Sequence, residues 1–138
     1  MSAMIVVAAA ALAVVVAWLL TRRSGIVREV DSGPAPVARP VATDLGLSRT
    51  GPTVVHFSAP WCVPCDQVRR VVEHVCGNLG DVAHVEVDMD AHPQTAHQFS
   101  VLSLPTTVIV DANGRQRYRT SSVPKAADLR AALEPLLA

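Results

Sequence analysis

Hydrophobic and polar positions change their spacing along the chain, and each spacing predicts a different element. Residues 3–20 form an apolar run without a charged side chain, which predicts one long helix. Residues 53–58 are rich in β-branched and aromatic side chains, as a buried central strand is. Residues 82–88 alternate between apolar and polar side chains, which indicates a strand with one buried face.

The segment between these two strands has a helical pattern. Apolar residues recur at intervals of three and four from Cys65 to Val75, and charged residues take the opposite face. Gly77-Asn78 and Gly80 are expected to end this helix. Because a strand, a helix and a second strand follow one another, the two strands are expected to pair in parallel.

The C-terminal third predicts a hairpin between two helices. Residues 93–99 indicate a short helix that Pro93 opens, and a last helix begins near Pro124. Asn113-Gly114 separates the strand-like residues 106–110 and 115–119, so these are expected to pair antiparallel. The succession predicts an α/β fold with a mixed sheet flanked by helices.

Composition sets the N-terminal run apart from the rest of the chain. Half of the 138 residues are hydrophobic, and residues 3–20 account for the excess. As a helix this run spans about 27 Å at roughly 1.5 Å per residue, close to the ~30 Å of a bilayer's hydrocarbon. Trp18 suits the membrane interface. A single-pass membrane anchor is therefore predicted over residues 1–22.

The residues that flank this run favour an anchor over a cleaved signal peptide. No basic side chain precedes the run, whereas Arg22 and Arg23 follow it at once. By the positive-inside rule these arginines stay in the cytoplasm, which places the C-terminal domain there too. The opposite orientation, with the domain outside the cytoplasm, stays open as the alternative.

Two further parts follow the anchor. Residues 23–42 contain Gly and Pro among small and charged side chains, which is typical of a linker. Residues 43–138 form the one folded domain, and residues 41–49 at its start indicate either a short edge strand or a helical turn. Residues 51–138 carry seven basic and nine acidic side chains without a basic stripe, so nucleic-acid binding has no support.

The chemistry of the chain is concentrated at Cys62 and Cys65, between the strand at 53–58 and the helix that follows. A cysteine at the first turn of a helix faces unpaired N–H groups and the positive end of the helix dipole, which lowers its pKa. That residue is Cys62, and Cys65 lies one turn further on the same side. Pro64 suits the first turn. The pair is therefore expected to open and close a disulfide.

Zinc binding is the alternative use of a Cys-x-x-Cys spacing, but it requires two more ligands. The third cysteine, Cys76, stands alone and no second Cys or His pair follows it. We therefore predict neither a metal nor a cofactor. Cys76 is expected to be a small buried side chain, with a regulatory disulfide as the less favoured alternative.

At Trp61–Cys65 the sequence resembles the thioredoxin superfamily, whose members carry Trp-Cys-x-Pro-Cys where a strand meets a helix. The resemblance implies a thioredoxin fold over residues 43–138, with an abbreviated N-terminal element. It also implies that Leu104-Pro105-Thr106 is the loop with a cis proline that faces the two cysteines. Substrate binding by this loop, by Trp61 and by Pro64 follows from the same resemblance.

The sequence departs from the family at two buried positions. Typical members carry an Asp six residues before the first Cys and a Lys on the neighbouring strand; these places are occupied here by His56 and His84. One hypothesis is a proton relay to Cys65, since imidazole changes charge near neutral pH. The other is that both histidines only fill half-buried strand positions with satisfied hydrogen bonds.

The function that the resemblance implies is that of a protein-disulfide reductase at the membrane. Cys62 would attack a substrate disulfide, and Cys65 would then release the reduced substrate. The implied partners are a disulfide-bearing protein and an upstream electron donor, either a thioredoxin reductase or a membrane reductant. Two alternatives remain: a non-catalytic thioredoxin-fold binding module, and an extracytoplasmic reductase of the cytochrome-maturation type.

Overall fold

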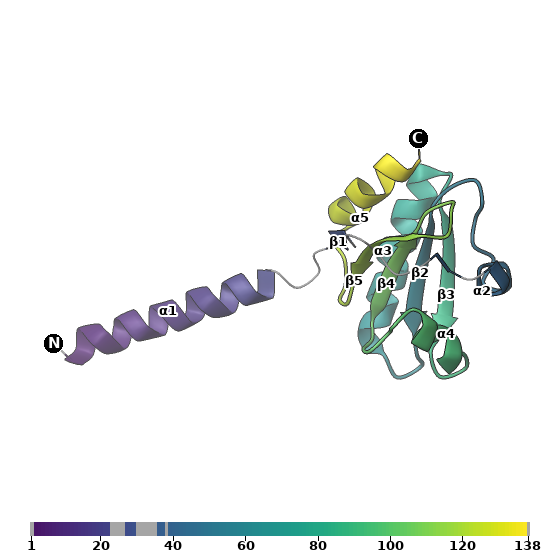
Figure 1. Ribbon diagram of the computed structural model, residues 1–138. Coiled ribbons are helices and arrows are strands. Elements are labelled where there is room, and N and C mark those ends of the chain that lie inside the picture. Colours follow the sequence, from purple (N-terminus) through teal and green to yellow (C-terminus); the bar gives the residue numbers. More distant parts are fainter. Residues whose placement is uncertain (1, 23–26, 30–35, 38, 138) are drawn as a thin grey trace.

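A mixed sheet of five strands carries the fold of the C-terminal part of the chain (Figure 1). The computed structural model describes residues 2–22, 27–29, 36–37 and 39–137. The elements are, in chain order, α1 (Ser2–Arg22), β1 (Arg28–Glu29), α2 (Arg39–Asp44), β2 (Thr53–Ser58), α3 (Val63–Leu79), β3 (Ala83–Asp88), α4 (Pro93–Gln98), β4 (Thr106–Val110), β5 (Gln116–Thr120), α5 (Ala126–Leu133) and the short 3-10 helix η1 (Glu134–Leu136).

The sheet has the strand order β1-β5-β4-β2-β3. β2 pairs with β3 in parallel and with β4 antiparallel, so β2 lies inside the sheet between two neighbours. β4 and β5 form the predicted antiparallel hairpin, whose turn contains Gly114 at a positive φ of 78°. Such a φ favours glycine because a side chain would clash there. The predicted strands and their pairing directions are thus confirmed.

Helices cover both faces of the sheet and enclose two cores. On one face α3 and α5 pack over Val54 of β2, and on the other α4 packs over Val55 and Phe57. All three of these side chains are fully buried. Burial on both faces explains why β2 consists of apolar and β-branched residues rather than an alternating pattern. This central strand leads directly to the two cysteines.

α3 ends at the second of the two predicted stops, Gly80, and not at the first. Gly77, expected to end the helix, lies within it, and the helix ends at Gly80, whose φ is +81°. A glycine inside a helix costs only about 1 kcal/mol relative to alanine. Buried Val75 and Cys76 and half-buried Leu79 pack this last turn against the core, which outweighs that cost.

The prediction for residues 23–42 is wrong at both of its described ends. Arg28 and Glu29 form β1, which pairs with Arg119 and Tyr118 of β5. Strand pairing uses backbone N–H and C=O groups, so a polar sequence does not prevent it. α2 begins at Arg39, which makes the abbreviated N-terminal element a helical turn rather than a strand. Val27, Pro36 and Val37 are also described, and the remaining predicted linker residues, including Gly25, Gly33 and Pro34, lie outside the described residues.

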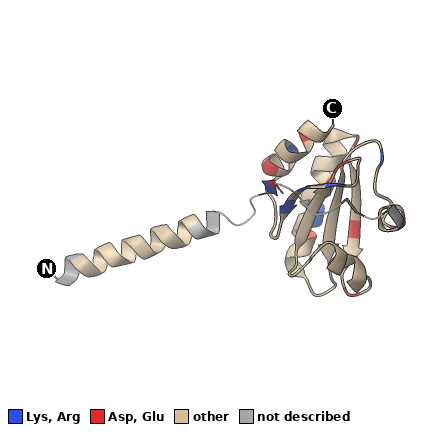
Figure 2. Ribbon diagram, in the orientation of Figure 1, with Lys and Arg blue, Asp and Glu red and all other residues tan. Residues whose placement is uncertain are grey.

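α1 stands apart from the sheet and its helices, and it carries no charged residue along its described middle (Figures 1 and 2). Its described side chains from Ile5 to Leu19 are exposed. They span roughly 22 Å at ~1.5 Å per residue. In the part of the chain that the structure describes, no helix is long and apolar enough to cross a membrane. The transmembrane anchor predicted for residues 1–22 is therefore not supported, and Arg23 lies outside the described residues.

Candidate active site

The two cysteines lie where β2 passes into α3. Cys62 occupies the residue just before α3, and Cys65 lies in its first turn after Pro64. Their sulfur atoms form a disulfide with an S–S distance of 2.09 Å and a Cα–Cα distance of 5.5 Å. Cys62 is 8% exposed and Cys65 only 1%. A partner molecule therefore reaches the sulfur of Cys62 first.

The loop with Pro105 lies against this pair, as predicted. The Leu104–Pro105 peptide bond is cis. Leu104 packs on the small apolar cluster of Ala59, Cys62 and Cys65. Thr106 donates a hydrogen bond from its Oγ1 to the carbonyl oxygen of Ser103 at 2.7 Å, which fixes the loop. Substrate contacts by these residues remain predictions.

Two exposed apolar side chains flank Cys62 in the sequence, and a third lies in the loop before Pro105. Outside α1, the large apolar side chains that are exposed among the described residues are Trp61, Val63 and Leu102. Trp61 directly precedes Cys62, and its Nε1 donates a hydrogen bond to Oδ2 of Asp90 at 3.0 Å. Exposed apolar surface is typical of contact sites for other proteins.

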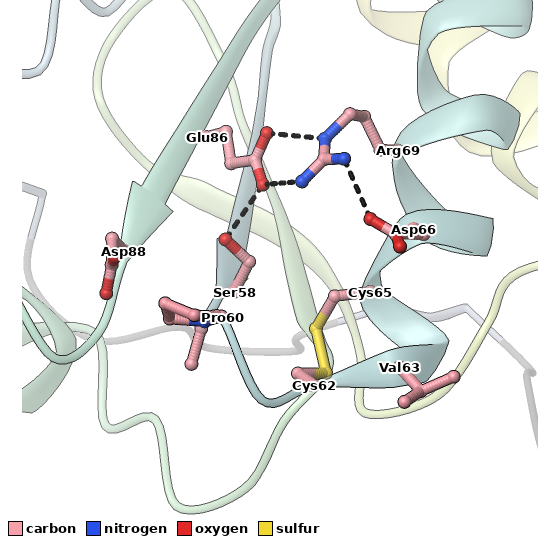
Figure 3. A pocket seen from close by; sticks show the side chains of 10 residues that line it. Ser58, Pro60, Cys62, Val63, Cys65, Asp66, Arg69, Glu86 and Asp88 are labelled. Atoms are coloured by element: carbon pink, nitrogen blue, oxygen red, sulfur yellow. Dashed lines mark hydrogen bonds and ion pairs between the residues drawn. A yellow bond between two sulfur atoms is a disulfide. The ribbon is translucent and has the colours of Figure 1, made fainter.

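A polar cavity of about 480 Å³ opens beside the disulfide (Figure 3). Both cysteines line it, and its charged and polar walls are Ser58, Asp66, Arg69, Glu86 and Asp88. Three carboxylates thus share this cavity with one guanidinium group. The local charge next to the sulfur atoms is negative.

Arg69 and Glu86 form the centre of a hydrogen-bonded network on this wall (Figure 3). Nε and Nη2 of Arg69 donate to Oε2 and Oε1 of Glu86 at 2.8 and 2.7 Å. Nη1 of Arg69 donates to Oδ1 of Asp66 at 2.8 Å, and the Ser58 hydroxyl donates to Oε1 of Glu86 at 2.8 Å. The hydrogen bonds from Arg69 lower the pKa of Glu86 to about 2, and the bond from Ser58 adds to this effect.

The two histidines approach one another, as the relay hypothesis expects. Their ring centroids are 6.3 Å apart and the rings are nearly parallel. His56 is fully buried, and neither of its ring nitrogens has a hydrogen-bond partner; Nε2 of His84 lacks one too. Burial lowers the pKa of His56 to about 4 and also lowers the pKa of His84. Both rings are therefore neutral near pH 7.

The strand register gives His56 a second neighbour on β3. His56 pairs with Glu86 across β2 and β3, while His84 pairs with Val54. The direct register partner of His56 on β3 is therefore Glu86, while His84 lies next to it on the same face of the sheet. Sequence reasoning missed Glu86 and Arg69. The sequence did contain the relevant pattern. Glu86 follows His84 by two residues, so both lie on the same face of β3, and Arg69 follows Cys65 by one helical turn.

Cys76 is a free, buried thiol, as expected. Burial raises its pKa to about 11, which keeps it protonated and unreactive near neutral pH. Among the described residues, no group of three or more His, Cys, Asp or Glu side chains lies close enough together to hold a metal ion.

A disulfide at the start of a helix, next to a cis proline and behind a central strand, defines a thiol-disulfide oxidoreductase with a thioredoxin fold. Comparison with known proteins agrees with this class. The sequence model of the thioredoxin family matches residues 44–134, which is more than half of the chain. The chain belongs to the thioredoxin family and is a protein-disulfide oxidoreductase.

Curated relatives are similar to this chain in sequence, and solved thioredoxin structures are similar to it in fold. The chain is 38% identical to the thioredoxin of Mycolicibacterium smegmatis over 92 residues, which cover 64% of this chain and 81% of that protein. It is 36% identical to a thioredoxin of Mycobacterium tuberculosis over 90 residues, which cover 64% and 77%. The solved structure of Fasciola hepatica thioredoxin superimposes with a TM-score of 0.58 at 26% identity, covering 70% of this chain and 88% of that one.

Proposed function

We propose that the protein acts as a disulfide reductase rather than as an oxidant. The charge of the cavity beside the sulfur atoms supports this direction. Strongly oxidising members of such systems have a stabilised reduced form. Here Asp66, Glu86 and Asp88 share the cavity with a single cation, Arg69, which disfavours a thiolate and so the reduced form. The dithiol is therefore expected to give up its electrons readily.

The reaction proceeds in two exchange steps. The Cys62 thiolate attacks one sulfur of a substrate disulfide, and the other substrate sulfur leaves with the electron pair and takes up a proton. Cys65 then loses its proton, and its sulfur attacks Cys62 in the mixed disulfide. The second substrate thiol departs, and the Cys62–Cys65 bond seen here is restored. An upstream electron donor must reduce this bond before the next cycle.

The direction is tested by the reduction potential of the pair, measured by equilibration of the full chain with glutathione or dithiothreitol buffers. The expected potential lies below roughly −230 mV, in the range of reducing dithiols. Asp66→Asn is expected to raise it by about 10–30 mV because it removes a carboxylate next to Cys65. Asp81→Asn, an exposed site away from the cavity, is the control. A potential above about −150 mV would contradict the reductive direction.

His56 is proposed to relay the proton of Cys65, with His84 in support. His56 lies between Val54 and Ser58 on the sheet face that α3 covers, and Ser58 shares the cavity with Cys65. Burial keeps the ring neutral near pH 7, and a neutral imidazole can accept a proton. The unpartnered ring nitrogens are available for this transfer.

Attachment to a membrane through residues 3–20 is a further proposal, which rests on the sequence. The run has no charged side chain, and Arg22 and Arg23 follow it. We expect the domain on the cytoplasmic side by the positive-inside rule. A C-terminal alkaline phosphatase, which is active only outside the cytoplasm, is therefore expected to show no activity on the full chain.

Two controls define the outcomes of the fusion experiment. Arg22→Glu with Arg23→Glu should weaken the orientation signal and increase the phosphatase activity. An active fusion of the unaltered chain would instead support the extracytoplasmic alternative, a reductase of the cytochrome-maturation type. Recovery of the fusion in the supernatant after centrifugation of membranes would contradict the attachment itself.

A further inference from the structure

We propose that Glu86 is a positioning residue for thiol-disulfide exchange: its carboxylate, held by Arg69 and Ser58, places a fixed negative charge beside His56 and stabilises the proton that His56 takes from Cys65. The inference rests on the proposed relay through His56. It assigns a role to the network on the cavity wall, which neither the disulfide nor the cis-proline loop explains.

The position of Glu86 follows from the strand register. Glu86 and His56 are direct partners across β3 and β2, so their side chains lie on the same face of the sheet. Both ring nitrogens of His56 lack a hydrogen-bond partner, and the residue is fully buried. A proton on this ring has no acceptor to share it with. Its stability therefore depends on the charges nearby.

The charged and titratable groups that act on His56 come from β3 and α3. Glu86 of β3 raises the pKa of His56, whereas His84 of β3 and Arg69 of α3 lower it. Burial lowers it further and is the largest effect. Glu86 is thus the one group among these that favours a protonated ring.

The hydrogen bonds to Glu86 keep it ionised, so its role differs from that of His56. Three donors, two from Arg69 and one from Ser58, hold the carboxylate at 2.7–2.8 Å. They keep the pKa of Glu86 near 2, so the carboxylate does not itself take up the proton. Glu86 supplies the charge, and His56 carries the proton.

The proton on His56 is formed and released within the second exchange step. The Cys65 thiol gives its proton to a ring nitrogen of His56, which becomes an imidazolium next to the ionised Glu86. The Cys65 thiolate bonds to the sulfur of Cys62, and the bond between Cys62 and the substrate sulfur breaks. The substrate leaves with that electron pair, and the proton of His56 returns to the departing thiolate or to water. Two electrons thus pass from the dithiol to the substrate.

Removing Glu86 and removing Arg69 should change the pKa of His56 in opposite directions, and this difference tests the inference. The probe is the His56 ring, followed by NMR in the oxidised full chain as the pH is varied. Glu86→Gln should lower the pKa of His56 by about one unit, and Arg69→Gln should raise it by about the same amount. One unit is a tenfold change in proton binding. Loss of packing alone would not move the two variants in opposite directions.

Asp88→Asn is the matched control, because it removes one carboxylate from the same cavity without touching the register partner of His56. Its effect on the His56 titration should be at most a few tenths of a unit. Equal shifts in Glu86→Gln and Asp88→Asn would overturn the inference, as would a fall in Arg69→Gln. If Glu86→Gln does not fold, the direction in which Arg69→Gln shifts the pKa of His56 still tests the inference.

Measurements of turnover distinguish a wrong role for Glu86 from a wrong relay through His56 and from a wrong reductase assignment. In insulin reduction at pH 7, Glu86→Gln should be slower than Asp88→Asn. If removal of His56 leaves the pH profile of turnover unchanged, the relay is wrong and Glu86 loses the role proposed here, while the reductase stands. If the unaltered chain does not reduce insulin at all, the reductase proposal itself fails.

Discussion

Cys62→Ser is expected to reduce insulin no faster than buffer with dithiothreitol, whereas Cys65→Ser is expected to accumulate as a mixed disulfide with its substrate. The exposure of the two residues explains the difference. Cys62 is 8% exposed at the start of α3, and Cys65 is 1% exposed behind it. The serine at 62 removes the nucleophile, and the serine at 65 removes the thiol that resolves the intermediate.

Mass spectrometry after a short reaction and alkylation measures both results. Cys65→Ser should gain the mass of a covalently bound substrate, and this mass should disappear with excess dithiothreitol. Cys76→Ala is the control, since the Cys76 thiol is buried and its pKa is raised to about 11. Turnover in this variant should equal that of the unaltered chain.

The same assay tests the non-catalytic alternative. The exposed side chains of Trp61, Val63 and Leu102 would also suit a module that only binds a partner. Such a module would retain its partner in Cys62→Ser and would show no turnover in any variant. Turnover that survives in Cys62→Ser would contradict the mechanism proposed here.

Replacement of His56 by leucine is expected to remove most of the acid sensitivity of the fold. Burial lowers the pKa of His56 from 6.5 to about 4, so between these values the unfolded chain binds a proton that the folded chain excludes. Folding stability therefore falls as the pH drops through this window. At pH 5 the loss relative to pH 7 is about 2 kcal/mol from this residue, since one unit corresponds to about 1.4 kcal/mol.

Urea unfolding at pH 7 and pH 5 measures this difference. His56→Leu should lose roughly 2 kcal/mol less than the unaltered chain between the two values, with the remainder from His84, whose pKa is also lowered by burial. At pH 7 the variant should be as stable or about 1 kcal/mol more stable, because two unpartnered buried nitrogens are gone. His74→Gln, an exposed change on α3, is the control. An unchanged difference in His56→Leu would refute the argument.

The same variant should reduce insulin more slowly, because Cys65 then lacks its proton acceptor. A residue whose removal stabilises the fold but slows the reaction is typical of function retained at the expense of stability. Turnover measured from pH 5 to pH 9 should lose its dependence on the His56 group. A profile identical to that of the unaltered chain would remove the relay.

Much of the fold could be predicted because its central elements are locally consistent. The residues of β2 favour a strand buried on both faces, and the alternation of β3 and the Asn113-Gly114 turn give their pairing partners. The two cysteines could be predicted because their chemistry needs those residue types at that spacing, whereas Pro105 was predicted from the resemblance to the thioredoxin family. In each case the local pattern and the tertiary environment agree.

The remaining features depend on contacts that no local pattern contains. β1 forms because the edge of β5 offers backbone hydrogen-bonding groups, whatever the side chains of Arg28 and Glu29. α3 extends past Gly77 because core packing continues on its last turn. The charge network could not be predicted because it depends on the register of β2 and β3, which makes Glu86 the direct partner of His56.

The pairing of β1 with β5 shortens the connection between the N-terminal helix and the catalytic domain. Only five residues separate Arg22, the last of α1, from Arg28, where the chain joins the sheet. Fully extended, such a stretch spans at most about 20 Å. If residues 3–20 are embedded in a bilayer, as proposed, the sheet edge stays within that distance of the end of α1, close to the lipid surface. Disulfides carried by other membrane proteins then come within reach more often than those of freely diffusing proteins.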